Sequence, residues 1–334
     1  MTGIRPGRDG DAAGFIQLIG ACWAEYPGCV MDVDAEVPEL RALATYFAQA
    51  GGALWAAEAD GEIVGMVGVK SGWEICKMYV AASHRGSGLA DALLDRAEGF
   101  ARQQSAENLE LWSDTRFARA HAFYARRGYV RGAIRVLNDL SNSLEFHYGK
   151  PVNGVAVLDA AAAASAERRL AEILVACVDS GASVSYLPPL APVVAQGFYH
   201  RMVADVAAGR RVLLAGWVDG VLAGTVMLDI GTPPNQPHRA EVQKVLVHPD
   251  ARRRGLARDL MLRVEQAAMD AGRTLLTLDT CAGDNGEKLY RSLGWTQAGC
   301  IPGYALDADG TPCDTLLFYK NLPVAPPVAR ETIG

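Results

Sequence analysis

The stretch WEICKMYVAASHRGSGLADALL, from Trp73 to Leu94, has a counterpart in the second half of the chain, AEVQKVLVHPDARRRGLARDLM, from Ala240 to Met261. The two copies keep one register: Glu74 and Glu241 stand 167 positions apart in a chain of 334 residues. Each copy has a β-prone apolar run, a loop rich in arginine and small residues, and then apolar residues at helical spacing. The order strand, loop and helix therefore occurs twice.

The match continues on both sides of these stretches. Upstream, ADGEIVGMVGV at 59–69 matches VDGVLAGTVML at 218–228, and downstream AFYARRGY at 122–129 matches KLYRSLGW at 288–295. Self-similarity over such a length indicates that a unit of roughly 150 residues has been duplicated, a usual size for one domain.

The boundary between the two units is predicted near GKPVNG at 149–154, which has two glycines and a proline between patterned regions. We expect an N-terminal domain at 1–150 and a C-terminal domain at 151–322. The remaining segment, 323–334, is rich in proline and has no periodicity, so a flexible tail is expected there.

The composition is typical of a globular protein, with 50% hydrophobic and 21% charged residues. A net charge of −6 gives no reason to expect binding to nucleic acid or to an anionic membrane. The chain has no apolar run long enough to span a membrane and no secretory signal pattern at its start. Its seven cysteines form no C-x-x-C pair, which favours reduced thiols, no metal site and a cytoplasmic location.

Each unit has the same expected order of elements. Two helical patterns precede a hairpin, whose turns are Asp60-Gly61 and Asp219-Gly220. A strand follows at 74–80 or 241–247, then the loop and an amphipathic helix, a further strand, a short helix with a tyrosine, and two last strands. This order predicts an α/β fold of two tandem domains, each a mixed, mostly antiparallel sheet with one parallel βαβ crossover.

The loop after the strand reads R-x-x-G-x-A in both units, as Arg85–Ala90 and Arg252–Ala257. Small residues let the backbone approach a ligand closely, and the N–H groups in the first turn of a helix bind anions. Such a site suits a diphosphate. The plainer interpretation is a helix start with an exposed basic residue, but its occurrence twice in one context favours the anion site. The other common phosphate motifs are absent.

The strand, this loop and the following helix resemble the GNAT superfamily of acyl-CoA-dependent N-acyltransferases, whose signature is [Q/R]-x-x-G-x-[G/A]. The C-terminal half, with HPDARRRGLARDLM, LTLDT and GYALDADGTPCDTLLFYK, further resembles tabtoxin-resistance-type acetyltransferases. The resemblance implies acetyl-CoA as cofactor, held by strand and loop. The implied contacts of the N-terminal unit are Met78, Tyr79, Val80, Arg85, Gly86, Ser87, Gly88, Leu89, Ala90 and Asp91. Those of the C-terminal unit are Val245, Leu246, Val247, Arg252, Arg253, Arg254, Gly255, Leu256, Ala257 and Arg258.

Acetyl transfer to an amine needs a group that removes the proton of an ammonium, whose pKa is about 10. Glu74 and Glu241 begin the strand that leads to the predicted cofactor contacts, so they are candidate bases; alternatively they pair with Lys77 or Lys244 or are solvated. The resemblance assigns Tyr124 and Tyr290 the protonation of the leaving thiolate, and the alternative is packing on coenzyme A. Cys76 has no counterpart in the second unit, which disfavours a covalent acyl-cysteine.

An asparagine that many family members carry seven residues before the tyrosine is absent. Phe117 and Gly283 stand in its place, and Asn285 is a candidate substitute. The second unit also has an extra segment, GTPPNQPH at 231–238, which we expect near the acceptor side.

The predicted function is transfer of an acetyl group from acetyl-CoA to a primary amine of a small molecule or peptide, by direct attack through a tetrahedral intermediate. The alternative is an acyl-CoA-binding sensor or scaffold in which one or both halves are not catalytic. The identity of the amine, the acyl-chain preference and the activity of each half stay open. So does the oligomeric state, with pairing of the two halves or a homodimer as options.

Overall fold

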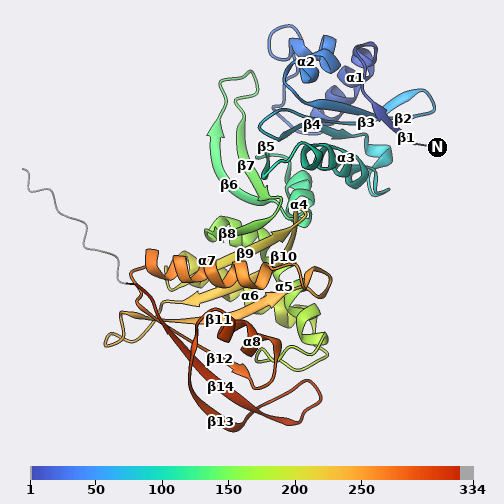
Figure 1. Cartoon of the computed structure of the whole chain (residues 1–334). Coiled ribbons are helices and arrows are strands. Elements are labelled where there is room, and N and C mark those ends of the chain that lie inside the picture. The colour runs from blue at the N-terminus through green and yellow to red at the C-terminus, as the bar shows by residue number, and fades with distance from the viewer. Residues whose placement is uncertain (1, 324–334) are drawn as a thin grey trace, which may run out of the picture. The chain divides into compact units, whose positions relative to one another are not determined.

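The computed structural model describes residues 2–323, so most of the segment expected to be a flexible tail lies outside the described residues. The chain divides into two compact units, which meet in sequence between Val152 and Asn153 (Figure 1). Residues up to Val152 are called unit 1 here, and those from Asn153 onward are called unit 2.

Unit 1 contains seven strands and four α-helices among its described residues. In chain order they are β1 (Gly3–Pro6), α1 (Ala12–Trp23), α2 (Leu43–Gln49), β2 (Ala53–Ala59), β3 (Glu62–Val69), β4 (Glu74–Val80), α3 (Leu89–Gln103), β5 (Asn108–Asp114), α4 (Ala118–Arg126), β6 (Val130–Val136) and β7 (Leu144–Pro151). Short 3-10 turns precede α1, α2 and α3.

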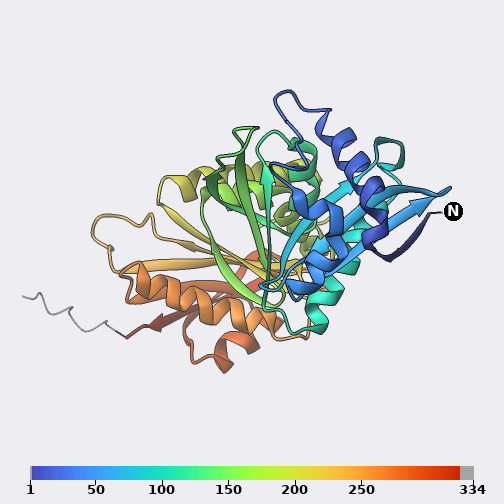
Figure 2. The same ribbon diagram turned by 90° about the horizontal axis from the view of Figure 1, so that it is seen from above.

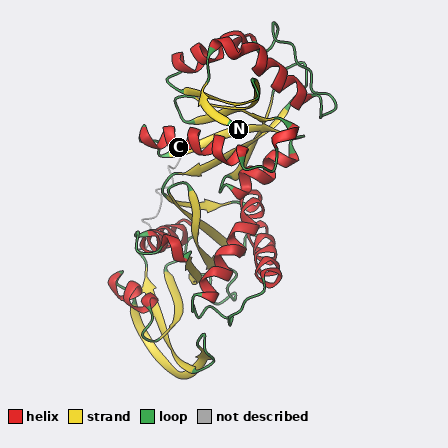
Figure 3. Ribbon diagram, turned by 90° about the vertical axis from the view of Figure 1, so that its right-hand side faces the viewer, coloured by secondary structure: helices red, strands yellow, loops and turns green. Residues whose placement is uncertain are grey.

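Unit 2 repeats this order with longer first helices and a longer last hairpin (Figure 3). Its elements are β8 (Gly154–Leu158), α5 (Ala160–Asp179), α6 (Pro192–Ala207), β9 (Arg211–Val218), β10 (Val221–Asp229), β11 (Arg239–Val247), α7 (Leu256–Asp270), β12 (Leu275–Cys281), α8 (Asn285–Ser292), β13 (Thr296–Leu306) and β14 (Pro312–Asn321).

The two sheets have the same topology. Unit 1 has the strand order β1-β2-β3-β4-β5-β7-β6, and unit 2 has the equivalent order β8-β9-β10-β11-β12-β14-β13. The one parallel pair in each described sheet joins the strands on either side of the crossover helix, β4 with β5 and β11 with β12. The expected fold class, two tandem domains with mixed, mostly antiparallel sheets and one parallel crossover each, is confirmed.

Helices cover both faces of each sheet. In unit 1, α3 packs with Leu93 and Ala97 against one face, and α1 and α2 pack with Phe15 and Phe47 against the other. In unit 2, α7 buries Leu260 and Val264 against its sheet, where it is the orange helix beside the yellow strands in Figure 2. The apolar residues at helical spacing in the sequence predicted the buried faces of α3 and α7, because only one stripe of such a helix meets a sheet.

The hairpin turns adopt the geometry that the sequence predicted. Asp60 and Gly61 have φ of 52° and 82°, and Asp219 and Gly220 have φ of 52° and 75°. Two successive positive φ values match the right-handed twist of the flanking strands, and aspartate and glycine tolerate them best.

The short first strands of both units, β1 and β8, were not expected from the sequence. Both lie at a sheet edge and have at most five residues, too few for a periodic signal. The segment GKPVNG is also less loop-like than expected, because β7 extends to Pro151 and β8 begins at Gly154. None of the helices within residues 2–323 has the length and apolar character needed to cross a membrane.

Candidate active site

The two parallel strands of each unit separate after their first residues. In the described residues, β4 and β5 pair only at Glu74–Ile75 with Glu110–Leu111, and β11 and β12 pair only at Arg239–Glu241 with Leu275–Thr277. Beyond these points the strands diverge, and a gap opens between them at the end where α3 or α7 begins.

A β-bulge changes the direction of the backbone in the middle of β4 and of β11. Lys77 has a φ of 50° and Lys244 a φ of 51°, and the ladder to the preceding strand shifts register beside each of them. Lysine is costly in the left-handed region, so the same strain at equivalent positions marks a feature that both units retain.

The loop before α3 or α7 ends in a glycine that caps the helix. Gly88 and Gly255 have φ of 83° and 87°, and no side chain caps either helix. The N–H groups of the first helical turn have no intrahelical partner, so they remain available to a ligand. Both units therefore have the glycine-capped helix start that the sequence predicted after the loop, and anion binding at this point remains a prediction.

The first arginine of the loop supports the end of the strand. Arg85 donates from Nε to the carbonyl of Val80 at 3.1 Å, and Arg252 donates in the same way to Val247 at 3.3 Å. These arginines were predicted as cofactor contacts, and the structure gives each a second task, because the guanidinium fixes the turn from strand to loop.

Two cysteines that sequence analysis did not single out take part in the same arrangement. The thiol of Cys22 on α1 lies 3.7 Å from the Val80 carbonyl, and that of Cys177 on α5 lies 3.3 Å from the Val247 carbonyl. The sequence signal that could have identified them is an Ala-Cys pair near the end of the first helix of each unit. Burial raises the pKa of both thiols, so they act as neutral donors.

A cavity of about 680 Å³ occupies the gap of unit 2. Ten of the predicted site residues line it, namely Val245, Leu246, Val247, Arg252, Arg253, Gly255, Leu256, Ala257, Arg258 and Tyr290. Arg254 is not among the lining residues and forms an ion pair with Asp219 at 2.7 Å. Asn285 does line the cavity, at the start of α8.

Tyr290 reaches the cavity from α8, and its ring is buried beside Trp295 and Phe318. Burial raises the pKa of its hydroxyl, and the nearby carboxylates Asp284 and Asp279 raise it further. The phenol therefore keeps its proton at neutral pH, as a proton donor must.

Asp279, on β12, is a cavity residue that the sequence did not predict. Burial of the Asp279 carboxyl raises its pKa, and the nearby Glu241 carboxylate raises it further. The positive charge of Lys244 acts in the opposite direction. A carboxylate with a raised pKa that is exposed to a cavity is a candidate base. The repeat gave no signal for it, because Trp112 occupies the matching position on β5.

Glu241, a predicted base, is not among the residues that line the cavity, although its carboxylate is close enough to act on Asp279. It accepts a hydrogen bond from the Gln243 amide at 2.8 Å, and Gln243 accepts one from Arg211 at 2.7 Å. Arg211 in turn pairs with Asp229 at 2.9 Å. Glu241 therefore belongs to a polar network across β9, β10 and β11 that ends beside Asp279.

Lys244 forms another part of the cavity wall. Its ammonium donates to the Ser185 hydroxyl at 3.0 Å and lies 5.8 Å and 6.0 Å from the ring centres of Phe198 and Tyr186. Burial lowers its pKa. Lys244 and Asp279 are thus a cationic and an anionic residue of the cavity wall, and the Lys244 ammonium lies beside two aromatic rings.

The predicted residues of unit 1 lie in equivalent places but have different neighbours. Tyr124 is buried, with ring centres of Tyr129 and Tyr148 each at 5.9 Å, and burial raises its pKa. Glu74 forms an ion pair with Lys70 at 2.8 Å across the β3–β4 turn. Tyr79 accepts a hydrogen bond from the Trp23 indole at 2.9 Å.

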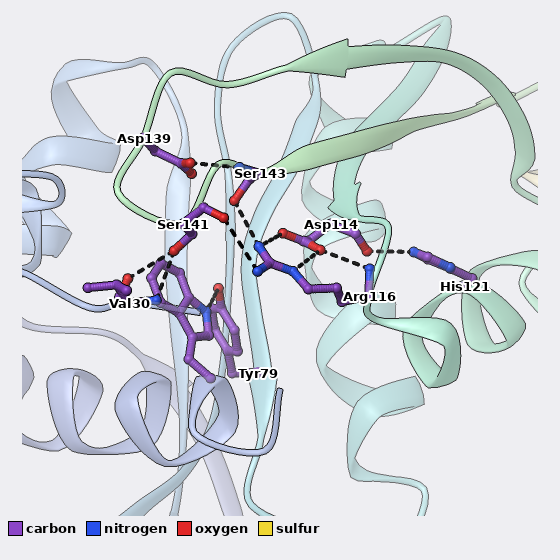
Figure 4. Close-up of polar contacts among 9 residues, drawn as sticks. Val30, Tyr79, Asp114, Arg116, His121, Asp139, Ser141 and Ser143 are labelled. Carbon is purple, nitrogen blue, oxygen red and sulfur yellow. Dashed lines mark hydrogen bonds and ion pairs between the residues drawn. The ribbon is translucent and has the colours of Figure 1, made fainter. Parts of the chain in front are cut away.

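A polar network joins three loops of unit 1 (Figure 4). Arg116 is held by Asp114 at 2.5 Å and by the Ser143 hydroxyl at 3.1 Å. Ser141, in the β6–β7 turn, accepts a hydrogen bond from the Val30 N–H at 2.8 Å and donates to the Val30 carbonyl at 3.3 Å. The segment between α1 and α2 is thereby attached to the β6–β7 turn.

Two further expectations can be compared with the structure. Burial raises the pKa of the Cys76 thiol to about 12, which makes it a poor nucleophile. The extra segment at 231–238 was expected near the acceptor side, but it lies where β10 turns into β11, beside the paired start of the parallel strands. No residue of this segment lines the cavity, and the Ile230 carbonyl just before it accepts a hydrogen bond from Arg273 at 3.1 Å.

Comparison with known proteins identifies the family of both units. The model of the acetyltransferase (GNAT) family matches residues 15–129 and 185–295. N-acetyltransferase 8F1 of Rattus norvegicus is 26% identical over 129 residues, which are 36% of this chain and 56% of that protein, so the chain spans about half of its relative's length.

Solved structures with a similar fold cover about one unit each. The ribosomal-protein-alanine N-acetyltransferase of Brucella melitensis matches 50% of this chain and 99% of its own, with 19% identity and a TM-score of 0.43. The Salmonella typhimurium protein yncA, solved with its cofactor acetyl-CoA, matches 53% and 99%, with 20% identity and a TM-score of 0.43. Because the family model matches both halves over more than half of the chain, the protein belongs to the acetyltransferase (GNAT) family, with two units of that family in tandem.

Proposed function

We propose that this protein is an N-acetyltransferase that moves the acetyl group of acetyl-CoA to a primary amine of a small molecule or peptide, and that unit 2 carries the transfer site. Membership of the family supports acyl transfer from acyl-CoA in general. The observation that carries the finer proposal is the cavity of unit 2, into which both Asp279 and Tyr290 open.

The residues that line the cavity support acetyl-CoA as the cofactor. The uncapped first turn of α7 offers N–H groups to the diphosphate, with Arg253 and Arg258 beside them. Val245 and Leu289 offer apolar surface to the pantetheine arm. A site of this chemistry fits a long thioester that carries a diphosphate better than a free phosphate, because apolar surface continues beyond the anion site.

Bound acetyl-CoA supplies the acetyl group as a thioester. In this proposal Asp279 removes the proton of the incoming ammonium. Its pKa is raised towards neutral pH, which makes it a stronger base than an ordinary carboxylate. Glu241 keeps Asp279 in that state by like-charge repulsion. Tyr290 holds a proton at its hydroxyl for the departing sulfur, and the backbone N–H groups at the end of β11 are placed to stabilise the oxyanion.

Unit 1 is favoured as a non-catalytic unit by its own contacts. The network of Arg116, Ser141 and Val30 attaches the α1–α2 segment to the β6–β7 turn (Figure 4). Trp112 replaces the cavity carboxylate. These features favour a unit 1 that does not carry out transfer.

The full chain should be incubated with acetyl-CoA and a panel of primary amines that includes a polyamine, amino acids, an aminoglycoside and a short peptide. Release of the coenzyme A thiol and mass spectrometry of the amine report transfer. Acetylation of at least one amine, lost in Asp279→Asn but kept in Trp112→Phe, supports the proposal. Binding of acetyl-CoA without acetylation of any amine would favour the sensor alternative for both units.

A further inference from the structure

Glu25 and Ser180 occupy equivalent positions in the two units. Each stands three residues after the cysteine whose thiol contacts the strand-end carbonyl, Cys22 or Cys177. Each also contacts the guanidinium of the first loop arginine. The two units therefore differ in one side chain that touches the anion-binding loop directly.

Glu25 holds the loop arginine of unit 1 with both carboxylate oxygens. Arg85 donates from its two terminal nitrogens at 2.8 Å and 2.7 Å, and these hydrogen bonds lower the pKa of Glu25. A forked pair of this kind is among the stronger ionic contacts in proteins. The loop arginine of unit 1 is therefore already neutralised by an anion from the same chain.

The same segment of unit 1 also reaches the helix on the other side of the gap. Glu25 lies 3.5 Å from Arg119 in the first turns of α4, and the ring of Tyr26 lies 4.6 Å from that of Phe117. Glu25 and Tyr26 thus connect α1, the loop before α3 and the start of α4. These are the elements between which the coenzyme has to lie.

In unit 2 these positions hold small residues. Arg252 donates to the Ser180 hydroxyl at 2.6 Å, so the arginine keeps its full positive charge. Ser180 and Gly181 line one side of the cavity, and Asn285 and Gly286 at the start of α8 line the other. In unit 1, Glu25 and Tyr26 bridge the gap between α1 and α4. In unit 2, the equivalent gap is part of the cavity.

The loop of unit 2 also has more positive charge than the loop of unit 1. In unit 2 Arg253 and Arg254 follow Arg252, and Arg258 lies in the first turn of α7. In unit 1 the matching residues are Gly86, Ser87 and Asp91. A diphosphate therefore meets several loop cations in unit 2, whereas in unit 1 the loop has one arginine, which is already paired with Glu25.

We propose that Glu25 and Ser180 decide which unit of the chain takes acyl-CoA: the Glu25 carboxylate occupies the diphosphate position of unit 1 and excludes the coenzyme, whereas Ser180 leaves that position open in unit 2. The inference rests on the proposed use of acetyl-CoA by unit 2. An anion that enters unit 1 has to break the Glu25–Arg85 pair and then tolerate the released carboxylate nearby.

Calorimetric titration of the full chain with acetyl-CoA tests this, because it gives both stoichiometry and affinity. The parent protein should bind one equivalent. Glu25→Ser should bind a second equivalent, and Ser180→Glu should weaken the original site by about tenfold or more, as expected for a like charge beside a bound anion. The double variant Glu25→Ser with Gly255→Glu should retain one site, which places the new site in unit 1.

Glu39→Ser is the matched control, because Glu39 pairs with Lys77 at 2.9 Å and is no part of the loop. It should leave one equivalent bound. Thermal unfolding of each variant checks that it is folded, and Glu25→Gln replaces Glu25→Ser if the serine variant is not. Two equivalents in the parent, or one equivalent in a folded Glu25 variant, would overturn the inference while the proposed function stands. Absence of any acetyl-CoA binding in the parent would instead overturn the proposed function.

Discussion

The Lys150 ammonium lies 2.8 Å from the Glu98 carboxylate, and the two side chains are only 1% and 3% exposed. Lys150 also donates to the Arg127 carbonyl at 2.9 Å, just after α4. Unit 2 repeats the arrangement, with Lys320 at 2.7 Å from Glu265 and at 2.8 Å from the Leu293 carbonyl, just after α8. In each unit the last strand thereby fixes the helix that bears the tyrosine against the helix that bears the anion site.

Removing one partner of the buried pair should destabilise unit 1 strongly. Lys150→Met leaves Glu98 charged and nearly inaccessible to water, and we expect a loss of about 3–5 kcal/mol in the free energy of unfolding. Lys320→Met should cost less, because Lys320 is 21% exposed and water can replace part of its contact. Urea unfolding of the full chain, followed by proteolytic mapping of each unit, would show the difference. Equal losses in the two variants would contradict the role of burial.

The same lysine should make stability depend on pH. Burial lowers the pKa of Lys150 from 10.5 to about 8, so between these values the unfolded chain binds more protons than the folded one. The free energy of unfolding contributed by Lys150 should therefore rise as pH increases from about 8 towards 10.5. The difference between parent and Lys150→Met in urea unfolding isolates this contribution from the tyrosines and thiols. A difference that is flat or falls over this range would contradict it.

Asp279→Asn should reduce the rate of amine acetylation by about 10²–10⁴, the usual contribution of a positioned base. The parent should lose activity as pH falls through the raised pKa of Asp279, because the carboxyl becomes protonated there. This acid limb should disappear in the variant, while the affinity for acetyl-CoA stays close to that of the parent. Measurements of kcat and kcat/KM against pH check both points, and an unchanged acid limb would exclude Asp279 as the base.

Tyr290→Phe and Tyr124→Phe form a matched pair, because both hydroxyls belong to buried rings on equivalent helices. We expect Tyr290→Phe to slow turnover about tenfold or more and Tyr124→Phe to leave it unchanged. Steady-state kinetics with a saturating amine gives the comparison. A similar loss from both substitutions would mean that unit 1 also performs transfer.

Gly255→Ala should weaken acetyl-CoA binding without filling any space. A Cβ at Gly255 meets no atom within 4 Å, but its φ of 87° is strained for any side chain. The side chain adds about 1 kcal/mol of backbone strain at this residue. We expect the loop to shift to relieve the strain, and the shift moves the first-turn N–H groups out of position. Gly88→Ala, with a φ of 83°, is the control in unit 1 and should leave binding by the full chain unchanged. Calorimetry with acetyl-CoA distinguishes the two variants.

Much of the fold could be predicted because its signals are local and occur twice. The hairpin turns at Asp60 and Asp219 depend on two residues each, and the glycine caps of α3 and α7 depend on the loop around them. The residues of these motifs are neighbours in sequence, so their pattern fixes their geometry. The edge strands β1 and β8 escaped prediction because short edge strands carry little pattern.

The site was predicted in part for the same reason. The loop, the end of β11 and Tyr290, which the resemblance to the GNAT superfamily grouped together, line one cavity. Asp279 was missed, because a carboxylate on a strand becomes a candidate base only through its neighbours Glu241 and Lys244, which lie on another strand. The bulges at Lys77 and Lys244 were missed as well, because lysine gives no signal for a positive φ.

The sequence by itself determined the duplication, the order of the elements and the family, because these depend on periodicity and on short motifs. Only the tertiary structure decided how the two units differ. Glu25 and Arg85 stand 60 positions apart, and nothing in the chain between them shows that the carboxylate meets the guanidinium. Charge, burial and access are properties of side chains brought together by folding, so two loops with one signature have different partners: Glu25 for Arg85 and Ser180 for Arg252.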